Sequence, residues 1–218
     1  MANTFLDNLD WRCAQKAFDP AKKVADEDLA KILHAIKMSP SSFGIQPYHF
    51  YVISDQATKM KLKEKGYNQQ QFEDASHVIV FCGRTDLADR INTYFEIASG
   101  GDSAKRESMK GYENMMKGFA EGKQGEDAMN WAHRQAYIAF GFAMAACAEL
   151  MIDSCPIEGF DAAEFDKLLN VPANMKSVAV LAIGYRKDAP QMPSQGLVSR
   201  GVRDPKVRFT DEDLFTKI

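Results

Sequence analysis

The sequence has little excess charge, no long apolar run and no recognisable export signal. Its 27 Lys and Arg residues nearly balance 30 Asp and Glu residues, for a net charge of −3. This balance gives no electrostatic reason to expect a nucleic-acid partner. No apolar run approaches the roughly 18 residues of a membrane span. The N-terminus "MANTFLDNLDWRC" has acids where a signal peptide would have basic residues. We therefore expect a soluble, cytoplasmic protein without a membrane segment.

Cysteine is scarce, and its spacing is not that of a redox or zinc motif. The four cysteines stand at positions 13, 82, 147 and 155, and no pair forms CxxC. Cys82 lies in a β-type run and Cys147 in an Ala-rich helical run, so both are expected to be small buried hydrophobes. An intracellular protein with this pattern is not expected to have a disulfide framework.

The common catalytic motifs are also missing. There is no HExxH and no Cys/His pair with zinc spacing, so no metal site is expected. His34 and His133 are more simply surface or hydrogen-bonded residues. No GxSxG elbow, no GxGxxG after a strand and no GxxxxGK[ST] loop occurs. An α/β-hydrolase, a Rossmann unit and a P-loop enzyme are therefore not indicated.

The apolar pattern predicts helices interleaved with a few strands. The 218 residues, 45% of them hydrophobic, can bury a real core. An apolar stripe predicts a helix over 26–38, which Pro40 ends. Strands are predicted at 49–54, 77–84 and 177–185, and the apolar run at 77–84 should be covered on both faces. Further helices are expected at 4–11, 56–65 and 161–169. The fold class is α+β, with helices covering a small sheet.

Three segments stand apart from this pattern. Residues 85–125 are helical but polar and glycine-containing, and we expect a helical excursion that is mobile relative to the core. Residues 126–152 predict one helix of roughly 40 Å. Its second half is apolar on nearly every side, which is typical of a core helix or a subunit interface. Residues 190–218 contain Pro190, Pro193 and Pro205 and cannot fold on themselves, so they form a disordered or an extended arm.

The stretch "SPSSFGIQPYHFYVI", residues 39–53, places serines, a glycine and one aromatic residue between a helix and a strand. Its loop has no acid or cysteine for chemistry, so we interpret it as part of the seat of a bound cofactor. Basic pairs near the two ends could clamp a phosphate. Arg12 and Lys16 would share a helix face, and Lys206 and Arg208 would share one side of an extended segment. Each pair could equally be solvated surface charge.

Five segments in order carry a resemblance to a known family. They are "RCAQKAFD" (12–19), "SPSSFGIQPYHFYVI" (39–53), "YNQQQFEDASHVIVFC" (67–82), "CPIEGFD" (155–161) and "KVRF" (206–209). The chain resembles the FMN-dependent nitroreductase family, on its oxygen-insensitive NAD(P)H nitroreductase branch. The resemblance implies one FMN-binding domain over residues 1–218, with a small central mixed β-sheet flanked by helices. It also implies a homodimer with FMN at the interface and an exchanged C-terminal arm.

The resemblance implies roles for individual residues. Arg12, Lys206 and Arg208 correspond to the cations that bind the FMN phosphate, and Lys16 to the lysine near N1 and O2 of the isoalloxazine. The other expected cofactor contacts are Cys13, Ala14, Pro40, Ser41, Ser42, Asn68, Gln71, Pro156, Ile157, Glu158 and Gly159. Pro40, Ser41 and Ser42 would come from the partner subunit and line the ribityl chain and phosphate. The backbone N–H groups of Glu158 and Gly159 would reach N5 and O4.

The sequence departs from the family pattern at several of these positions. Cys13 and Ala14 stand where the family commonly has Arg or His and then Ser, so a hydroxyl contact is lost. Gln71 stands where some relatives have a second lysine, which removes a positive charge near the pyrimidine. Phe43 replaces a smaller polar residue and would narrow the substrate side. Tyr67 and Phe119 are the other expected substrate contacts, although each could be a plain core aromatic.

The resemblance therefore implies that the flavin does the chemistry and that no side chain is a catalytic nucleophile or acid. Lys16 would steady the negative charge of the reduced ring. NADH or NADPH would give hydride to N5, and a nitroaromatic, quinone or similar flat acceptor would then be reduced in a ping-pong reaction. Three alternatives stay open. They are a specialised member (dihydropteridine or flavin reductase, reductive dehalogenase), a non-catalytic flavin-binding protein and a helical interaction module without a ligand.

Overall fold

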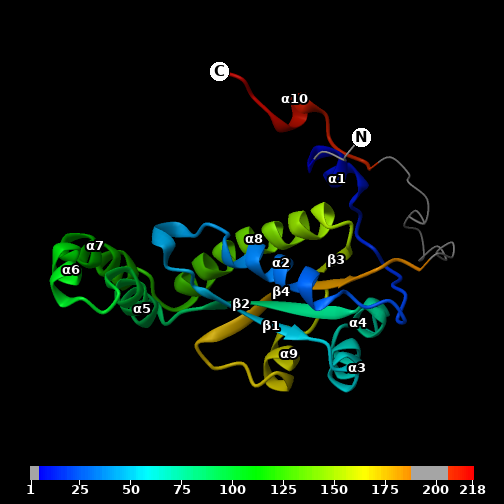
Figure 1. Ribbon diagram of the computed structural model, residues 1–218, viewed down its shortest axis with the longest axis horizontal. Coiled ribbons are helices and arrows are strands. Elements are labelled where there is room, and N and C mark those ends of the chain that lie inside the picture. Colours follow the sequence, from blue (N-terminus) through cyan, green and yellow to red (C-terminus); the bar gives the residue numbers. More distant parts are fainter. Residues whose placement is uncertain (1–4, 188–205) are drawn as a thin grey trace.

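The computed structural model describes residues 5–187 and 206–218. A four-stranded sheet of order β1-β2-β4-β3 lies at the centre, with helices on both of its faces (Figure 1). Its strands are β1 (Tyr48–Ile53), β2 (His77–Arg84), β3 (Asp153–Ile157) and β4 (Met175–Gly184). The α+β class predicted from the sequence is therefore confirmed.

The sheet differs from the prediction in two ways. It has a fourth strand, β3, which the sequence pattern missed because it is only five residues long and contains Pro156. Proline is tolerated there because β3 is an edge strand. The expected mixed sheet is wrong, because all three strand pairings are antiparallel. The described residues have one parallel contact beside the sheet, an isolated bridge between Ala14 and Ser154.

The helices predicted at 4–11, 26–38, 56–65, 126–152 and 161–169 are present with small shifts of their ends, and the predicted helical excursion contains three helices. Two short helices, α4 and α10, were not predicted. The helices are α1 (Phe5–Trp11), α2 (Asp26–Lys37), α3 (Gln56–Lys65), α4 (Gln71–Asp74), α5 (Leu87–Ser99), α6 (Ser103–Ser108), α7 (Lys110–Glu121), α8 (Gly125–Glu149), α9 (Ala162–Leu168) and α10 (Asp211–Leu214). A short 3-10 turn, η1, covers Ser42–Gly44. The long helix α8 ends before residue 152 because Met151 adopts a left-handed conformation, with φ 54°.

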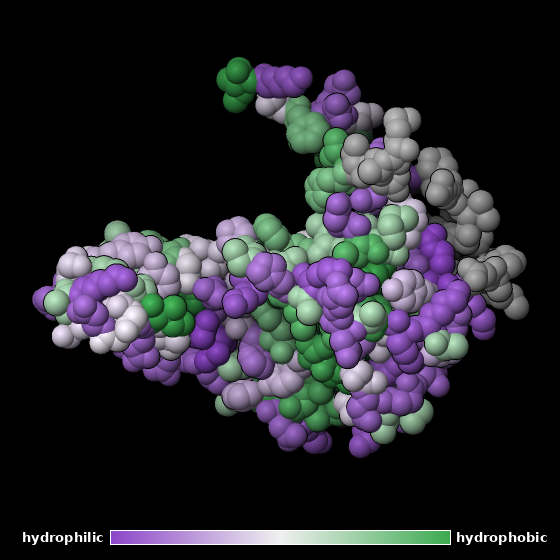
Figure 2. All heavy atoms as spheres, in the orientation of Figure 1, coloured by the Kyte–Doolittle hydropathy of each residue, from purple (hydrophilic) through white to green (hydrophobic). Residues whose placement is uncertain are grey.

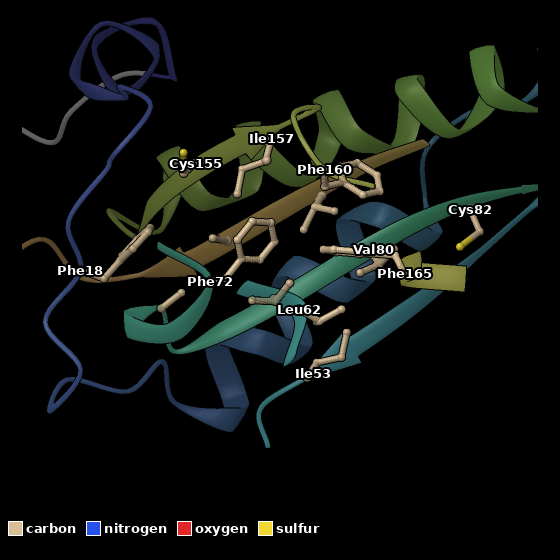
Figure 3. Packing of buried hydrophobic residues seen from close by; sticks show 14 residues of the cluster. Phe18, Ile53, Leu62, Phe72, Val80, Cys82, Cys155, Ile157, Phe160 and Phe165 are labelled. Atoms are coloured by element: carbon tan, nitrogen blue, oxygen red, sulfur yellow. The ribbon is translucent and has the colours of Figure 1, made fainter. Parts of the chain in front are cut away.

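Strand β2 divides the core into two layers, as its apolar sequence predicted. Val78, Val80 and Cys82 point into one layer, and Ile79 and Phe81 point into the other. Figure 3 shows the first layer, which α3, α4 and α9 cover. Helices α2 and α8 cover the second layer (Figure 1). Burial on both faces fixes the register of β2, since a slip of one residue would exchange the two layers.

Cys82 and Cys147 are buried in these layers, as predicted, and Cys155 is buried there too. Cys82 and Cys147 have no exposed surface, and burial raises the pKa of each thiol to about 12. Such thiols are inert at neutral pH. All four cysteines are free.

Helices α5, α6 and α7 form a projection beside the sheet (Figure 1). A third apolar cluster, which includes Phe95, Met116 and Trp131, joins them to α8. Glu113 lies inside the projection with 1% of its side chain exposed, 2.6 Å from Lys117 Nζ and 3.1 Å from a guanidinium nitrogen of Arg106. Hydrogen bonds from these two cations lower the pKa of Glu113 to about 2.

Hydrophobic side chains are exposed at two places in the single chain, on α8 and on the C-terminal segment. The second half of α8 was expected to be buried all round, but Ile138 is 38% and Phe142 41% exposed. They lie four residues apart, so they share one face of α8. The C-terminal segment extends away from the body of the fold and carries exposed hydrophobic residues, among them Phe209 and Phe215 (Figures 1 and 2). Within residues 5–187 and 206–218, no helix is both long and apolar enough to span a membrane.

Candidate functional site

The segment after α1 runs along the edge of the sheet. The Gln15 N–H donates to the Ser154 carbonyl at 3.0 Å, and Phe18 pairs with Arg186 beyond the end of β4. The guanidinium of Arg186 binds Asp153 and also lies over the Trp11 ring, 4.8 Å from its centre. These contacts fix the segment that carries Arg12, Cys13, Ala14 and Lys16 beside β3.

Cations from both ends of the chain meet at this segment. The pKa of Lys206 is lowered by partial burial and then by the positive charges of Arg12 and Arg208, while Asp10 has a smaller opposite effect. The Lys206 ammonium donates to the Leu9 carbonyl. The Arg12 backbone N–H donates to the Asn8 carbonyl at 3.0 Å, and its guanidinium has no hydrogen bond or ion pair with any residue in the described ranges. The structure thus brings together three of the cations that the sequence singled out, Arg12, Lys206 and Arg208.

Lys16 and Gln71 lie close together near Cys155 in β3. Burial raises the pKa of the Cys155 thiol, and the nearby Lys16 ammonium opposes this rise. Gln71 is 4% exposed, with its Nε2 4.0 Å from Cys155 Sγ. That Nε2 also donates to Gln69 Oε1 at 2.8 Å. Lys16 and Gln71, two of the three residues predicted at the pyrimidine edge of a flavin, are therefore neighbours, and Asn68 is the third.

The turn after β3 presents free backbone donors. Pro156 and Ile157 end the strand, and the Ile157 side chain packs into the core, so only its backbone faces the site. Glu158 and Gly159 follow and are exposed. Within residues 5–187 and 206–218, neither of their N–H groups has a hydrogen-bond acceptor. These are the two N–H groups that the resemblance assigned to N5 and O4.

Tyr67 and Asn68 form a turn that faces this strand end. Both adopt left-handed backbone conformations, with φ of 56° and 55°. Such conformations are costly for residues other than glycine and often mark functional sites. Asn68 is exposed and Tyr67 is 68% exposed. The Tyr67 ring passes 3.9 Å from where a Cβ on Gly159 would stand.

The loop between α2 and β1 has its own internal bonds. Ser41 Oγ accepts from the Gln46 N–H at 3.0 Å, and the Ser42 N–H donates to Gln135 Oε1 of α8 at 2.9 Å. Phe43 adopts φ 56°, and its ring lies 5.0 Å from that of Phe119 in α7. Pro40 is exposed. Two of the three predicted substrate contacts, Phe43 and Phe119, therefore pack together.

This loop lies far from the cation cluster in a single chain. Asn8, in α1, donates to Glu149 at the end of α8, whereas Ser42 contacts Gln135 of the same helix. Gln135 and Glu149 are 14 positions apart in α8, which corresponds to about 20 Å of helix. Figure 1 likewise shows the loop toward the projection and α1 at the opposite end. The predicted site residues thus divide into two groups within one chain.

Two residues near the site were not predicted from the sequence. Tyr137 of α8 donates its hydroxyl to Glu158 Oε1 at 2.7 Å, and Gln69 Nε2 donates to the Gly159 carbonyl at 2.6 Å. Burial and the Glu158 carboxylate raise the pKa of Tyr137. Gln69 lies inside the amide-rich segment 67–71, which was a usable signal. Nothing local in the sequence marks Tyr137.

Known proteins share both the sequence pattern and the fold. The chain matches the model of the Nitroreductase family over residues 9–185. A Staphylococcus epidermidis protein named "Putative NAD(P)H nitroreductase" is 32% identical over 228 residues, covering 100% of this chain and 98% of its own. A Bacillus subtilis crystal structure titled "putative nitroreductase" has TM-score 0.82 at 20% identity, with 98% of each chain covered. One from Exiguobacterium sibiricum, in complex with FMN, has TM-score 0.82 at 20% identity, with 100% and 99% covered.

The fold is therefore nitroreductase-like. The family match and the similar proteins named NAD(P)H nitroreductases place the chain among the oxidoreductases. The chain belongs to the Nitroreductase family. This confirms the resemblance drawn from the five sequence segments, including its α+β architecture.

Proposed function

We propose that the protein is an FMN-dependent oxidoreductase that takes hydride from NADH or NADPH and reduces nitroaromatics, quinones or similar flat acceptors. It works as a homodimer of single FMN-binding domains, each comprising residues 1–218. The observation that carries this proposal is the gathering of Arg12, Lys206 and Arg208, whose side chains bind no carboxylate within the described residues. The free N–H donors of Glu158 and Gly159 lie beyond the end of β3.

The cation cluster fits the phosphate of FMN. Partial burial, and then the like charges of Arg12 and Arg208, lower the pKa of Lys206, so a bound dianion would relieve an existing repulsion. Arg12 is free to bind through two N–H groups at once. Arg208 donates to the Val207 carbonyl at 2.7 Å through one nitrogen and keeps its other donors.

The end of β3 fits the isoalloxazine ring. When bound, FMN supplies two-electron hydride transfer through its N5 atom. Glu158 and Gly159 offer N–H donors to that edge, and the Lys16 ammonium supplies positive charge at the pyrimidine edge, where electron density rises on reduction. Gln71 is an uncharged neighbour of Lys16, so a single cation acts there.

The homodimer explains why the predicted residues divide into two groups. Pro40, Ser41, Ser42 and Phe43 lie about 20 Å along α8 from the cations of their own chain. A partner chain can bring its loop to those cations instead. The exposed Ile138 and Phe142 of α8 and the exposed C-terminal arm supply the apolar surface that such an interface buries.

The aromatic pair Phe43 and Phe119 supports flat acceptors. Aromatic rings favour offset or tilted contacts with other aromatic rings. One neighbour of TM-score 0.81 at 18% identity is described as an enone reductase, so an enone belongs in the acceptor panel.

An anaerobic absorbance titration tests the proposal. Protein reconstituted with FMN should bleach on addition of NADH or NADPH and regain its yellow colour when a nitroaromatic or quinone is added. Protein that binds FMN but is bleached by neither nicotinamide would be a non-catalytic flavoprotein. Protein that does not bind FMN would contradict the proposal.

A further inference from the structure

Two side chains hold the Glu158–Gly159 turn, and the proposed function assigns neither of them a role. Tyr137 donates to the Glu158 carboxylate at 2.7 Å. Gln69 Nε2 donates to the Gly159 carbonyl at 2.6 Å and to the Gly66 carbonyl at 2.9 Å. These residues lie on α8 and on the loop before α4, so the turn is tied to two elements distant in sequence.

The Gln69 hydrogen bond and the neighbouring backbone hydrogen bond together fix the direction of the Gly159 N–H group. No peptide bond in the described residues is cis, so the carbonyl and the N–H of each peptide point in opposite directions. Gln69 holds the Gly159 carbonyl, which orients the N–H of Phe160 on the same peptide. That N–H donates to the Glu158 carbonyl at 3.0 Å. The Glu158 carbonyl in turn directs the Gly159 N–H away from the chain.

Tyr137 completes the arrangement by fixing the Glu158 side chain. The bond uses the carboxylate as an acceptor and leaves the Glu158 N–H without a partner in the described ranges. Glu158 and Gly159 are exposed, so these bonds bury little surface. Hydrogen bonds at such a turn add little to global stability, and their main effect is on orientation.

We infer that Gln69 and Tyr137 are positioning residues that aim the Glu158 and Gly159 N–H groups at the flavin ring. The inference rests on the proposed function, because it gives those N–H groups a ring to bind. It distinguishes ring recognition at this turn from phosphate recognition at Arg12, Lys206 and Arg208.

The two kinds of recognition can be separated with FMN and riboflavin, which share the ring but differ in the phosphate. Gln69→Leu and Tyr137→Phe should each raise the dissociation constants of both flavins by about fivefold. Arg12→Ala should raise the dissociation constant of FMN and leave that of riboflavin nearly unchanged. Matched controls are Gln70→Leu, which does not touch Gly159, and Tyr51→Phe, whose hydroxyl has no hydrogen bond within the described residues. Both controls should bind like the parent.

A conservative variant distinguishes positioning from general damage. Glu158→Gln keeps an oxygen that accepts from Tyr137, so it should retain parental flavin affinity. Glu158→Ala should lower the affinity for both flavins as much as Tyr137→Phe does. The double variant Glu158→Ala/Tyr137→Phe should bind the flavins no more weakly than either single variant. Backbone ¹⁵N relaxation in the flavin-free protein should show lower order parameters for residues 158 and 159 in Gln69→Leu and Tyr137→Phe.

The outcomes separate this inference from the proposed function. If the parent binds both flavins and Gln69→Leu and Tyr137→Phe bind them equally well, the positioning role is overturned and the proposed function stands. If Gln69→Leu and Tyr137→Phe bind FMN more weakly but bind riboflavin as the parent does, the positioning role is also overturned. If the parent binds neither flavin, the proposed function fails and this inference fails with it.

Discussion

The two groups of site residues differ in how the chain holds them. The group around Arg12 and Lys16 lies on a segment bonded to β3, so the sheet itself sets its position. The loop group, Pro40 to Phe43, is held by α8 and by the projection α5–α7. The first group comes together within one chain, whereas in the proposed homodimer the second group reaches it from the other copy. The difference teaches that, in such a dimer, half of the site would be formed before assembly.

The largest expected effect tests the first group. Arg12→Ala removes a charge-assisted bond to phosphate, so the FMN dissociation constant should rise about 10- to 100-fold while the protein stays folded. Fluorescence titration with FMN measures this, with Lys61→Ala on the exposed face of α3 as the control. Unchanged FMN affinity in Arg12→Ala would remove Arg12 from the phosphate site.

The next largest effect is on stability and concerns Glu113, in the projection α5–α7 that holds the loop group. The pKa of Glu113 is lowered from 4.5 to about 2, so its stabilisation is complete above pH 4.5 and is lost as the pH falls toward 2. Glu113→Gln should cost about 2 kcal/mol at neutral pH and flatten the acid limb of the stability curve. Urea unfolding at pH 7 and pH 3 measures it. An acid limb as steep in Glu113→Gln as in the parent would show that other groups cause the acid loss.

A smaller effect tests the chemistry at the end of β3. Lys16→Met keeps the length of the side chain and removes its charge, so flavin reduction by the nicotinamide should slow about tenfold. Stopped-flow absorbance measures the rate, and Lys16→Arg should restore most of it. If Lys16→Met reduces as fast as the parent, the charge has no role in hydride transfer.

The smallest effect concerns acceptor selection by the loop. Asparagine tolerates the left-handed conformation of Phe43 better than phenylalanine does. Phe43→Asn should therefore fold normally, lower the KM for bulky acceptors about threefold and leave the rate with a small quinone unchanged. A panel of acceptors graded by size measures it. Equal changes for all sizes would mean that Phe43 does not shape the pocket.

Local patterns and the family motifs predicted much of this molecule, and the failures have physical causes. The run 77–84 predicted β2 because burial on both faces leaves a continuous apolar sequence. Strand β3 was missed because Pro156 and polar residues hide a short edge strand. That Arg12 and Lys206 lie close together in the fold could be predicted only from the family motif. Tyr137 could not be predicted, because its bond to Glu158 depends on how α8 packs against the sheet.

Mixed dimers test most directly whether each site takes its cations from one chain and its loop from the other. We would combine Arg12→Ala with Ser42→Asp, which places a negative charge on the loop. In a dimer that carries Arg12→Ala in one chain and Ser42→Asp in the other, one site should hold both defects and the other none. FMN content should then be half of the parental value with undiminished affinity. Two equally weakened sites in that dimer would contradict the account.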